Sequence, residues 1–342
     1  MAITIKDIAK AAGVSHTTVS RALHDHPAIS QETVEKIKRL AVKMGYVPNA
    51  TARGLKTRRT CALGVIVSQI DDPFWSEVLQ GIDEVLHPAG YSLFVTVTHR
   101  DKQREKEVVQ ALVQRGVDGV IVCAPQFSPD QSQSLNAYGL PMVVVNNEGS
   151  AESQYLVYNE DRYGSRLVTR HVIALGHRQI AFLGNAQGGR TTSEREKGFR
   201  QELKAAQLKV TEAYIHPAPH STPDGGYAAT GYLLSLAVRP TAIICYNDNM
   251  AVGVYSALYQ AGLRVPQDMS VVGYDDIAFA AFLTPPLTTL RQFKHDLGSG
   301  AARLMLRILE ARTESGDWLE PQKVGLNGEL VVRNSTAAPG ST

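Results

Sequence analysis

Two short helices joined by a tight turn are predicted by residues 4–23, TIKDIAKAAGVSHTTVSRAL. The first helix has apolar residues at the i, i+3, i+4 and i+7 positions of one face, namely Ile5, Ile8, Ala9 and Ala12. Gly13 gives the turn a permissive backbone. Ser15 is a natural N-cap for the second helix, whose Val19 and Leu23 face inward.

The second helix leaves three polar side chains facing outward near its start, His16, Thr17 and Arg21. A helix-turn-helix protein places the N-terminal residues of its recognition helix on base edges in the DNA major groove. The alternative is a small three-helix packing unit with a solvated polar face. We favour the DNA reader because residues 30–60 supply a third helix and a basic linker.

The third helix and the linker are predicted from capping residues and periodicity. Ser30 can cap a helix that Gly45 ends, with one apolar face made by Val34, Ile37, Leu40, Ala41 and Met44. Asn49 can then cap a short helix over residues 50–56. A helix this short is marginal alone, since isolated helices below about 12–15 residues rarely persist. It needs a second copy, DNA, or both.

Positive charge is concentrated at the N-terminus. Residues 1–60 carry eleven Lys and Arg against four Asp and Glu, a net of +7. The whole chain is +2, so the remaining 282 residues carry −5. This asymmetry favours contact between the N-terminal region and phosphates.

Composition sets the broader bounds. With 342 residues and 44% hydrophobic content the chain can form more than one core. No apolar run approaches a membrane span and no signal peptide is evident, so we expect a cytoplasmic protein without membrane contact. The cysteines, Cys61, Cys123 and Cys245, are far apart and are expected to be reduced. The tail after Asn334 is expected to fray.

From residue 62 onward, short apolar runs alternate with amphipathic stretches. The runs rich in Val and Ile lie at 62–67, 92–97, 119–123, 141–145, 179–183, 241–245 and 270–273. The expected helices lie at 76–87, 104–115, 162–175 and 249–261. This pattern predicts an α/β protein with two doubly wound parallel-sheet lobes behind a small all-α head. Ligands bind such lobes beyond the carboxyl ends of the strands and in the cleft between them.

Polar and aromatic residues come directly after several of these runs. They are residues 72–75 (Asp-Pro-Phe-Trp), Asn146, residues 193–199 with Arg195, the pair Asn247 and Asp248, and the pair Asp275 and Asp276. Planar polar groups suit the adjacent hydroxyls of a sugar, and aromatic rings cover its C–H faces. The alternatives are structural: helix capping for Asp248 or Asp276, and a core or dimer contact for Phe74 and Trp75.

The chain resembles the LacI/GalR family of transcriptional regulators over essentially its whole length. The matching motifs lie at residues 7–15, 18–21, 45–49, 52–55, 174–177, 247–251, 272–276 and 285–289. The resemblance implies a homodimer whose core is of the periplasmic-binding-protein type and crosses between lobes three times. It places a helix-turn-helix domain at 1–46, a hinge helix and linker at 47–60, one lobe at 61–160 plus 291–320, and the other at 161–290 plus 321–336.

The resemblance also implies roles for particular residues. His16, Thr17 and Arg21 would contact bases, and Leu55 would wedge into the minor groove of the operator. The full set of implied DNA-binding residues is Thr4, Ser15, His16, Thr17, Arg21, Asn49, Ala52, Arg53 and Leu55. The implied effector-binding residues are Phe74, Asn146, Arg195, Asn247, Asp275 and Gln292.

Two departures from the family pattern affect the pocket. Asn146 stands where several relatives carry an acid, and no ligand-stacking aromatic can be assigned within residues 219–223 (Pro-His-Ser-Thr-Pro). Residues 251–287 resemble the ribose-repressor branch most. The leading effector is therefore ribose or a related pentose or hexose, and a purine base is the alternative.

Three classes of function were compared. A ligand-gated DNA-binding regulator, expected to be a repressor, accounts for the head, the hinge and the strand-end residues together. An enzyme is disfavoured, because the chain lacks a phosphate-binding Gly-rich loop, a nucleophile elbow and any metal-ligand spacing. We therefore expect no catalytic residue, metal or cofactor. A sugar-binding transport protein is disfavoured by the N-terminal reader. No leucine heptads occur after Val332, so we expect no tetramer-forming coiled coil.

Overall fold

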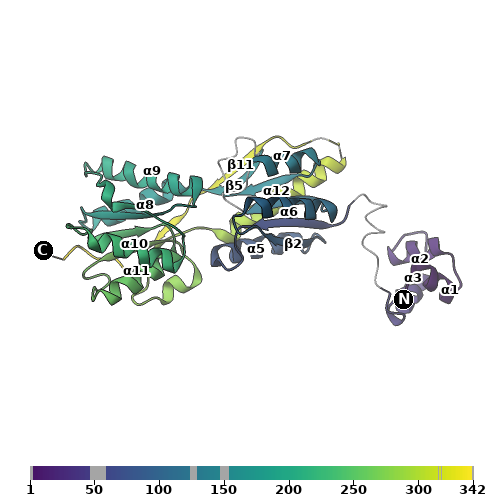
Figure 1. Cartoon of the computed structure of the whole chain (residues 1–342). Coiled ribbons are helices and arrows are strands. Elements are labelled where there is room, and N and C mark those ends of the chain that lie inside the picture. Colours follow the sequence, from purple (N-terminus) through teal and green to yellow (C-terminus); the bar gives the residue numbers. More distant parts are fainter. Residues whose placement is uncertain are drawn as a thin grey trace. The chain divides into compact units, whose positions relative to one another are not determined.

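The computed structural model describes residues 3–46, 59–123, 129–146, 154–314, 316 and 318–340. The chain divides into two compact units, Met1–Thr60 and Cys61–Thr342 (Figure 1). The expected hinge helix lies outside the described residues, and so do four of the implied DNA-binding residues, Asn49, Ala52, Arg53 and Leu55.

The N-terminal unit contains the predicted helix-turn-helix. Its helices are α1 (Ile5–Ala12), α2 (His16–Leu23) and α3 (Gln31–Lys43). Gly13 ends α1 with a φ of +70°, a conformation that glycine adopts at little cost. The three helices share a core in which Ile8, Val19 and Ile37 are fully buried. This unit therefore presents α2 on a small independent core.

The second unit contains two six-stranded sheets, one in each lobe. The first sheet has the strand order β11-β5-β4-β3-β1-β2. All its neighbouring strands are parallel, and its strands are β1 (Ala62–Val67), β2 (Ser92–Val97), β3 (Gly119–Cys123), β4 (Met142–Val145), β5 (Tyr155–Asn159) and β11 (Gln322–Leu326).

The second sheet repeats this arrangement in the order β12-β10-β9-β8-β6-β7. Only β12 is antiparallel to its neighbour. The strands are β6 (Ile180–Asn185), β7 (Ile215–Ala218), β8 (Ala242–Cys245), β9 (Ser270–Asp275), β10 (Thr288–Arg291) and β12 (Glu329–Val331). The prediction of two doubly wound lobes is thus confirmed.

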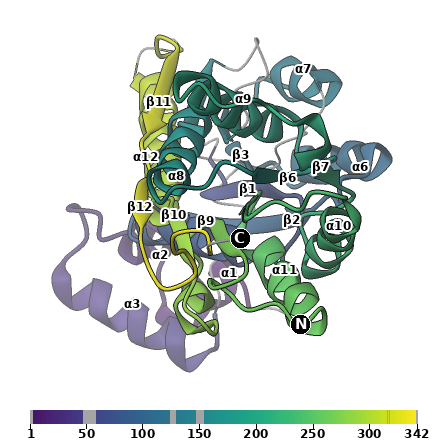
Figure 2. The same ribbon diagram turned by 90° about the vertical axis from the view of Figure 1, so that its left-hand side faces the viewer.

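Helices cover both faces of each sheet. In the first lobe, α5 (Pro73–Leu86) and α12 (Lys294–Glu314) pack on one face, and α6 (Lys102–Gln114) and α7 (Pro129–Ala137) on the other. In the second lobe, α8 (Asp161–Ala174) and α9 (Gly189–Ala205) lie opposite α10 (Pro223–Ser235) and α11 (Asp248–Gln260) (Figures 1 and 2). Two short 3₁₀ helices, η1 (Glu212–Tyr214) and η2 (Ala278–Phe282), complete the second lobe.

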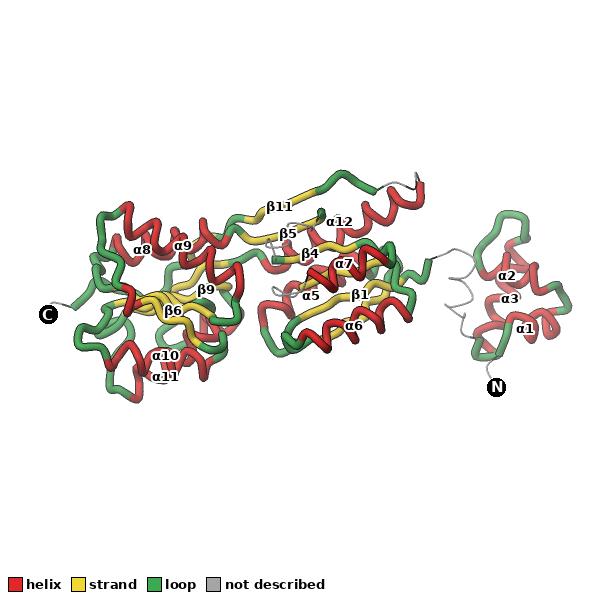
Figure 3. Tube along the Cα trace, turned by 45° about the horizontal axis from the view of Figure 1, so that its top comes forward, coloured by secondary structure: helices red, strands yellow, loops and turns green. Residues whose placement is uncertain are grey.

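The chain crosses between the lobes three times. It passes from β5 to α8 at Glu160, and from β10 to α12 between Arg291 and Lys294. The third crossing, expected near residue 320, lies further along the chain. Residues 322–326 form β11, which pairs with β5 in the first lobe (Figure 3), so only the residues after Leu326 return to the second lobe. The difference arises because a short, polar edge strand gives little hydrophobic signal.

The C-terminal segment is packed rather than frayed, which corrects the expectation. Ser335 is fully buried, its hydroxyl accepts from Thr288 N at 2.8 Å, and its carbonyl accepts from Val271 N at 2.9 Å. Buried His177 lies with Nε2 2.8 Å from the carbonyl oxygen of Ala337. Burial lowers the pKa of His177, so a neutral imidazole holds this segment. Its role is structural.

Among the described residues, no helix is long and apolar enough to cross a membrane. The three cysteines are free thiols, and Cys123 and Cys245 are buried in the sheets.

Candidate functional site

A cleft between the two lobes brings together all six residues that were expected to bind an effector. They reach it from both lobes and from the carboxyl ends of different strands, and they are Phe74, Asn146, Arg195, Asn247, Asp275 and Gln292. Strand ends meet at one edge of a parallel sheet, so residues far apart in sequence converge there. The position of each residue is set by the element that precedes it.

Arg195 is held in one orientation before any ligand contact. It lies on α9, and its Nε donates to Asp161 Oδ1 at 2.7 Å while its Nη1 donates to the carbonyl oxygen of Tyr246. Its guanidinium carbon lies 3.6 Å from the centre of the Tyr274 ring and 4.7 Å from that of Tyr246. A planar guanidinium fixed in this way can present its remaining N–H groups to a ligand oxygen.

Asp275 ends β9 and lies opposite Arg195 in the cleft. Gln292 Nε2 donates to Asp275 Oδ1, and Gln292 Oε1 is buried without a partner among the described residues. Burial raises the pKa of Asp275 well above its usual value, although the Arg195 guanidinium opposes the shift. The pair therefore offers oxygen acceptors to hydroxyl groups of a ligand.

Lys294 holds the backbone that carries Asp275. Asp275 and Asp276 adopt φ values of +115° and +52°, which side-chain-bearing residues rarely adopt. The buried Nζ of Lys294 donates to both of their carbonyl oxygens at 2.7 Å and lies 3.3 Å from Glu77 of α5. One amine thus ties the strand end of the second lobe to a helix of the first.

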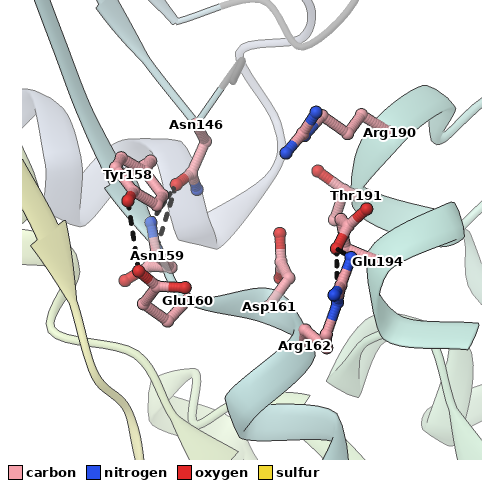
Figure 4. A pocket seen from close by; sticks show the side chains of 9 residues that line it. All are labelled: Asn146, Tyr158, Asn159, Glu160, Asp161, Arg162, Arg190, Thr191 and Glu194. Atoms are coloured by element: carbon pink, nitrogen blue, oxygen red, sulfur yellow. Dashed lines mark hydrogen bonds and ion pairs between the residues drawn. The ribbon is translucent and has the colours of Figure 1, made fainter. Parts of the chain in front are cut away.

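Three further predicted residues line the cleft, the amides Asn247 and Asn146 and the aromatic Phe74. Asn247 caps α11, its Oδ1 accepting from Met250 N at 2.9 Å. Asn146 Oδ1 accepts from Asn159 N at 2.9 Å (Figure 4). Phe74 packs edge-on against Trp75 with ring centres 4.9 Å apart, and both rings belong to the core of the first lobe. The core alternative for these rings is therefore confirmed, and contact of Phe74 with a ligand stays a prediction.

Asp248 and Asp276, for which helix capping was the alternative to ligand binding, do not line the cleft. Asp248 is fully buried and accepts from Thr289 Oγ1 at 2.6 Å and from Ile277 N at 2.9 Å. Burial raises its pKa to about 7. Asp276 pairs with Arg291 and Arg333 at 2.7 and 2.6 Å, and these arginines lower its pKa against the opposing effect of burial. Both carboxyls thus have structural partners within the second lobe.

Other residues of the cleft lining were not among the six implied effector-binding residues. They are Ser68, Asp72, Trp75, Arg100, Thr191, Ser221 and Tyr246. Of these, Asp72 and Trp75 belong to the strand-end stretch 72–75 that the sequence singled out. Ser68 and Tyr246 come directly after β1 and β8, so the rule that strand ends carry ligands could have identified them. Arg100 Nη1 donates to Gln187 Oε1 at 2.9 Å, a hydrogen bond between the two lobes. Nothing in the sequence indicates that contact.

The N-terminal unit exposes the residues expected to contact bases. His16, Thr17 and Arg21 are all solvent-exposed on α2. Thr4 and Ser15 are helix caps: Thr4 forms a capping box with Asp7, and Ser15 Oγ accepts from Thr18 N at 3.0 Å. Capping fixes the start of each helix and thereby the direction in which α2 presents its exposed face.

A helix-turn-helix unit followed by a two-lobed core with a polar interlobe cleft defines a class, the ligand-responsive DNA-binding regulators. Within the part of the chain that the structure describes, no cluster of His, Cys, Asp and Glu could hold a metal ion. The cleft presents hydrogen-bonding side chains that are held in place beside aromatic rings.

Comparisons with known proteins agree with this class. Residues 4–49 match the family model "Bacterial regulatory proteins, lacI family", and residues 169–336 match the model of a periplasmic binding protein-like domain. The HTH-type transcriptional repressor PurR of Haemophilus influenzae (strain PittEE) is 33% identical over 333 residues, which cover 97% of this chain and 98% of that protein.

Two solved structures are similar along the chain. The lac repressor dimer bound to operator and the anti-inducer ONPF has a TM-score of 0.88 and 27% identity, covering 99% of this chain and 100% of that one. A LacI family regulator from Enterococcus faecium with bound ribose has a TM-score of 0.72 and 29% identity, covering 81% of this chain and 99% of that one. The chain belongs to the lacI family of bacterial regulatory proteins.

Proposed function

We propose that the chain is a repressor that binds a pseudo-palindromic operator as a homodimer, and that a small sugar in the interlobe cleft controls its affinity for the operator. The sugar is ribose or a related pentose or hexose. The observation that carries the proposal is the cleft itself, where Arg195, Asn247, Asp275 and Gln292 converge beside the ring of Phe74. Amides, a carboxyl and a guanidinium match the vicinal hydroxyls of a sugar.

Ribose is favoured by the resemblance to the ribose-repressor branch and by the ribose bound to the Enterococcus faecium relative. A purine base is the second candidate, because the rings of Phe74 and Tyr246 line the same cleft and can stack on a planar base.

Operator contact is assigned to two segments. His16, Thr17 and Arg21 on the exposed face of α2 enter the major groove, with Thr4 and Ser15 beside the phosphates. In the hinge at 47–60, Leu55 wedges between base pairs in the minor groove, Ala52 packs against it, and Asn49 and Arg53 lie near phosphates. Two copies of the chain are needed for a symmetric operator.

Exposed aromatic residues of the second lobe support self-association. Phe282 on η2 is 83% exposed and Tyr259 on α11 is 85% exposed. These elements are neighbours, since the Tyr255 hydroxyl of α11 donates to the carbonyl oxygen of Pro285 just beyond η2 at 3.0 Å. Large exposed apolar side chains mark protein interfaces. We place the partner copy on this face, and sedimentation of the Phe282→Ser, Tyr259→Ser variant should show a monomer where the parent is a dimer.

The mechanism is thermodynamic coupling between cleft and hinge. The lobes touch across the cleft through Arg100 and Gln187, and through the Lys294 amine and the carbonyl oxygens of Asp275 and Asp276, so a ligand that contacts both lobes changes their relative position. In a dimer this alters the separation of the two hinges and so their ability to pair on DNA. Linkage requires that the effector and the operator change each other's affinity by the same factor.

A thermal-shift screen of the full chain tests the effector assignment. The panel contains D-ribose, D-xylose, D-glucose, D-galactose, hypoxanthine and guanine. A ligand that binds the native state raises the melting temperature. We expect a sugar to give the largest increase. An increase with hypoxanthine or guanine alone would transfer the assignment to the purine candidate.

A further inference from the structure

The backbone of Cys61, where the chain enters the first lobe, is held by residues at the start of β2 and just before β3. The Cys61 N–H donates to Asp118 Oδ2 at 2.9 Å, and its carbonyl oxygen accepts from Ser92 N at 2.9 Å. Asp118 N in turn donates to the carbonyl oxygen of Ala62 at 2.8 Å. We call this set of hydrogen bonds, made by Cys61, Ala62, Ser92 and Asp118, the entry clamp.

Cys61 has a backbone conformation that residues with a side chain rarely adopt. Its φ is +52°, which lies in the left-handed region. Such a conformation persists only where the surrounding structure holds it. The Asp118 carboxylate supplies that restraint, because a backbone N–H makes a stronger hydrogen bond to a charged acceptor than to a neutral one. The direction in which the backbone enters β1 is thus set at Cys61 and held by Asp118.

Asp118 is itself held in place by its two neighbours in the chain. Val117 is buried. Gly119 packs so closely on α12 that an added Cβ would lie 2.7 Å from Met305 Sδ. A side chain that starts from such a fixed stretch of backbone presents its carboxylate in a defined position. Asp118 can therefore determine the conformation of Cys61 rather than follow it.

Strand β1 connects the entry clamp to the effector cleft. It begins directly after Cys61, is buried along its whole length and lies between β2 and β3. Ser68, the residue that follows its last one, lines the cleft. Six residues of strand span roughly 20 Å. The clamp therefore lies at the opposite end of this strand from the cleft, too far away to contact a ligand there.

We propose that Asp118 is a positioning residue for operator binding, because its carboxylate fixes the direction in which the linker at 47–60 joins the first lobe. This inference rests on the proposed function, which assigns operator contact to that linker. Two linkers that start in defined directions lose less conformational freedom when they bind one operator. Without the clamp the linkers are spread over more directions, and the cost of ordering them on DNA rises.

Fluorescence anisotropy with the full chain tests this inference. The probe is a DNA duplex that the parent selects from a random-sequence library, and a scrambled duplex of the same composition is the reference. Asp118→Ala removes the acceptor and should weaken binding of the selected duplex at least about tenfold. Binding of the scrambled duplex should change less than about twofold, because non-specific binding depends on the positive charge of the N-terminal unit.

Three further variants separate positioning from a general loss of stability. Asp118→Asn keeps a side-chain oxygen for the Cys61 N–H and should stay within about threefold of the parent. Cys61→Pro leaves Asp118 in place but has no N–H and cannot adopt a positive φ, so it should show the same loss as Asp118→Ala. Asp130→Ala is the matched control, because it removes a carboxylate from the exposed first turn of α7 in the same lobe. It should bind both duplexes as the parent does.

The outcomes separate the inference from the proposed function. Parental affinity for the selected duplex in either Asp118→Ala or Cys61→Pro would overturn the positioning role and leave operator binding in place. Equal losses for selected and scrambled duplexes would overturn it too, and so would a loss in Asp118→Asn as large as that in Asp118→Ala. If the parent selects no duplex from the library, the proposed function fails, and the inference with it.

Discussion

Replacement of Asp275 by Asn should separate effector binding from stability. The carboxyl is 6% exposed, accepts from Gln292 Nε2 and faces the cleft. An Asn side chain keeps an oxygen for Gln292 and turns an NH₂ group toward the ligand, so a carboxyl oxygen is lost from the cleft. A net hydrogen bond contributes about 0.5–1.5 kcal/mol. The dissociation constant of the sugar chosen by thermal shift should therefore rise roughly twofold to tenfold.

The free energy of unfolding of Asp275→Asn should respond to pH differently from that of the parent. Because burial raises the pKa of Asp275 above its ordinary 3.8, the folded state holds this proton more tightly than the unfolded chain does. The contribution of this group to stability is complete below pH 3.8 and is lost as the pH rises through the raised pKa. The Asn variant has no such loss. At pH 8 its free energy of unfolding in urea should equal or exceed that of the parent.

Asp276→Asn is the matched control at the neighbouring position. Arg333 and Arg291 lower the pKa of Asp276, so its stabilising contribution is present at neutral pH. Its loss should cost about 1–3 kcal/mol of unfolding free energy and change sugar affinity less than twofold. The reasoning is refuted if calorimetry gives Asp275→Asn the parental affinity, or if urea unfolding at pH 8 shows Asp275→Asn to be the less stable variant of the two.

Further predictions concern the DNA-binding unit and a buried carboxyl. Arg21→Ala should abolish discrimination between operator and scrambled DNA in fluorescence anisotropy; retained discrimination would remove Arg21 from base recognition. Leu55→Ala should weaken operator binding and reduce the bend measured by circular-permutation gel shift, and an unaltered bend would contradict a minor-groove wedge. Burial raises the pKa of Asp248 to about 7, so parental stability should fall as pH rises from about 4 to 7. Asp248→Asn should show a smaller fall in urea unfolding; parallel pH profiles would contradict the shift.

The sequence predicted the structure best where apolar residues recurred at regular helical spacing or where an apolar run had clear ends. The spacing of Ile5, Ile8, Ala9 and Ala12 predicted α1, and apolar runs predicted β1, β2 and β3 with the bounds that the structure shows. Helix α5 begins three residues earlier than expected, because Asp72 caps it and Pro73 suits its first turn. All six predicted cleft residues converge in the cleft: Asn146, Asn247, Asp275 and Gln292 lie at or just after strand ends of the two sheets, whereas Phe74 and Arg195 lie on helices α5 and α9.

The features that the sequence missed depend on contacts between distant segments. Edge strand β11 has a largely polar exterior and is identifiable only by its pairing with β5. Arg100 reaches the cleft through a loop whose direction no local pattern determines, and its partner Gln187 is in the other lobe. Ser335 is buried only because β9 and β10 have backbone groups that it satisfies. The roles of these residues follow from contacts between distant segments of the folded lobes and not from any local sequence pattern.

Coupling between cleft and operator is measured most directly by titrating operator DNA into the full chain with and without a saturating concentration of the sugar that binds. Because the sugar and the operator each favour a particular arrangement of the same two lobes, the sugar should change the operator dissociation constant at least about fivefold. The operator should change the sugar affinity by the same factor. If the sugar binds fully and the operator dissociation constant is unaltered, the cleft and the DNA-binding unit are independent and the proposed switch is contradicted.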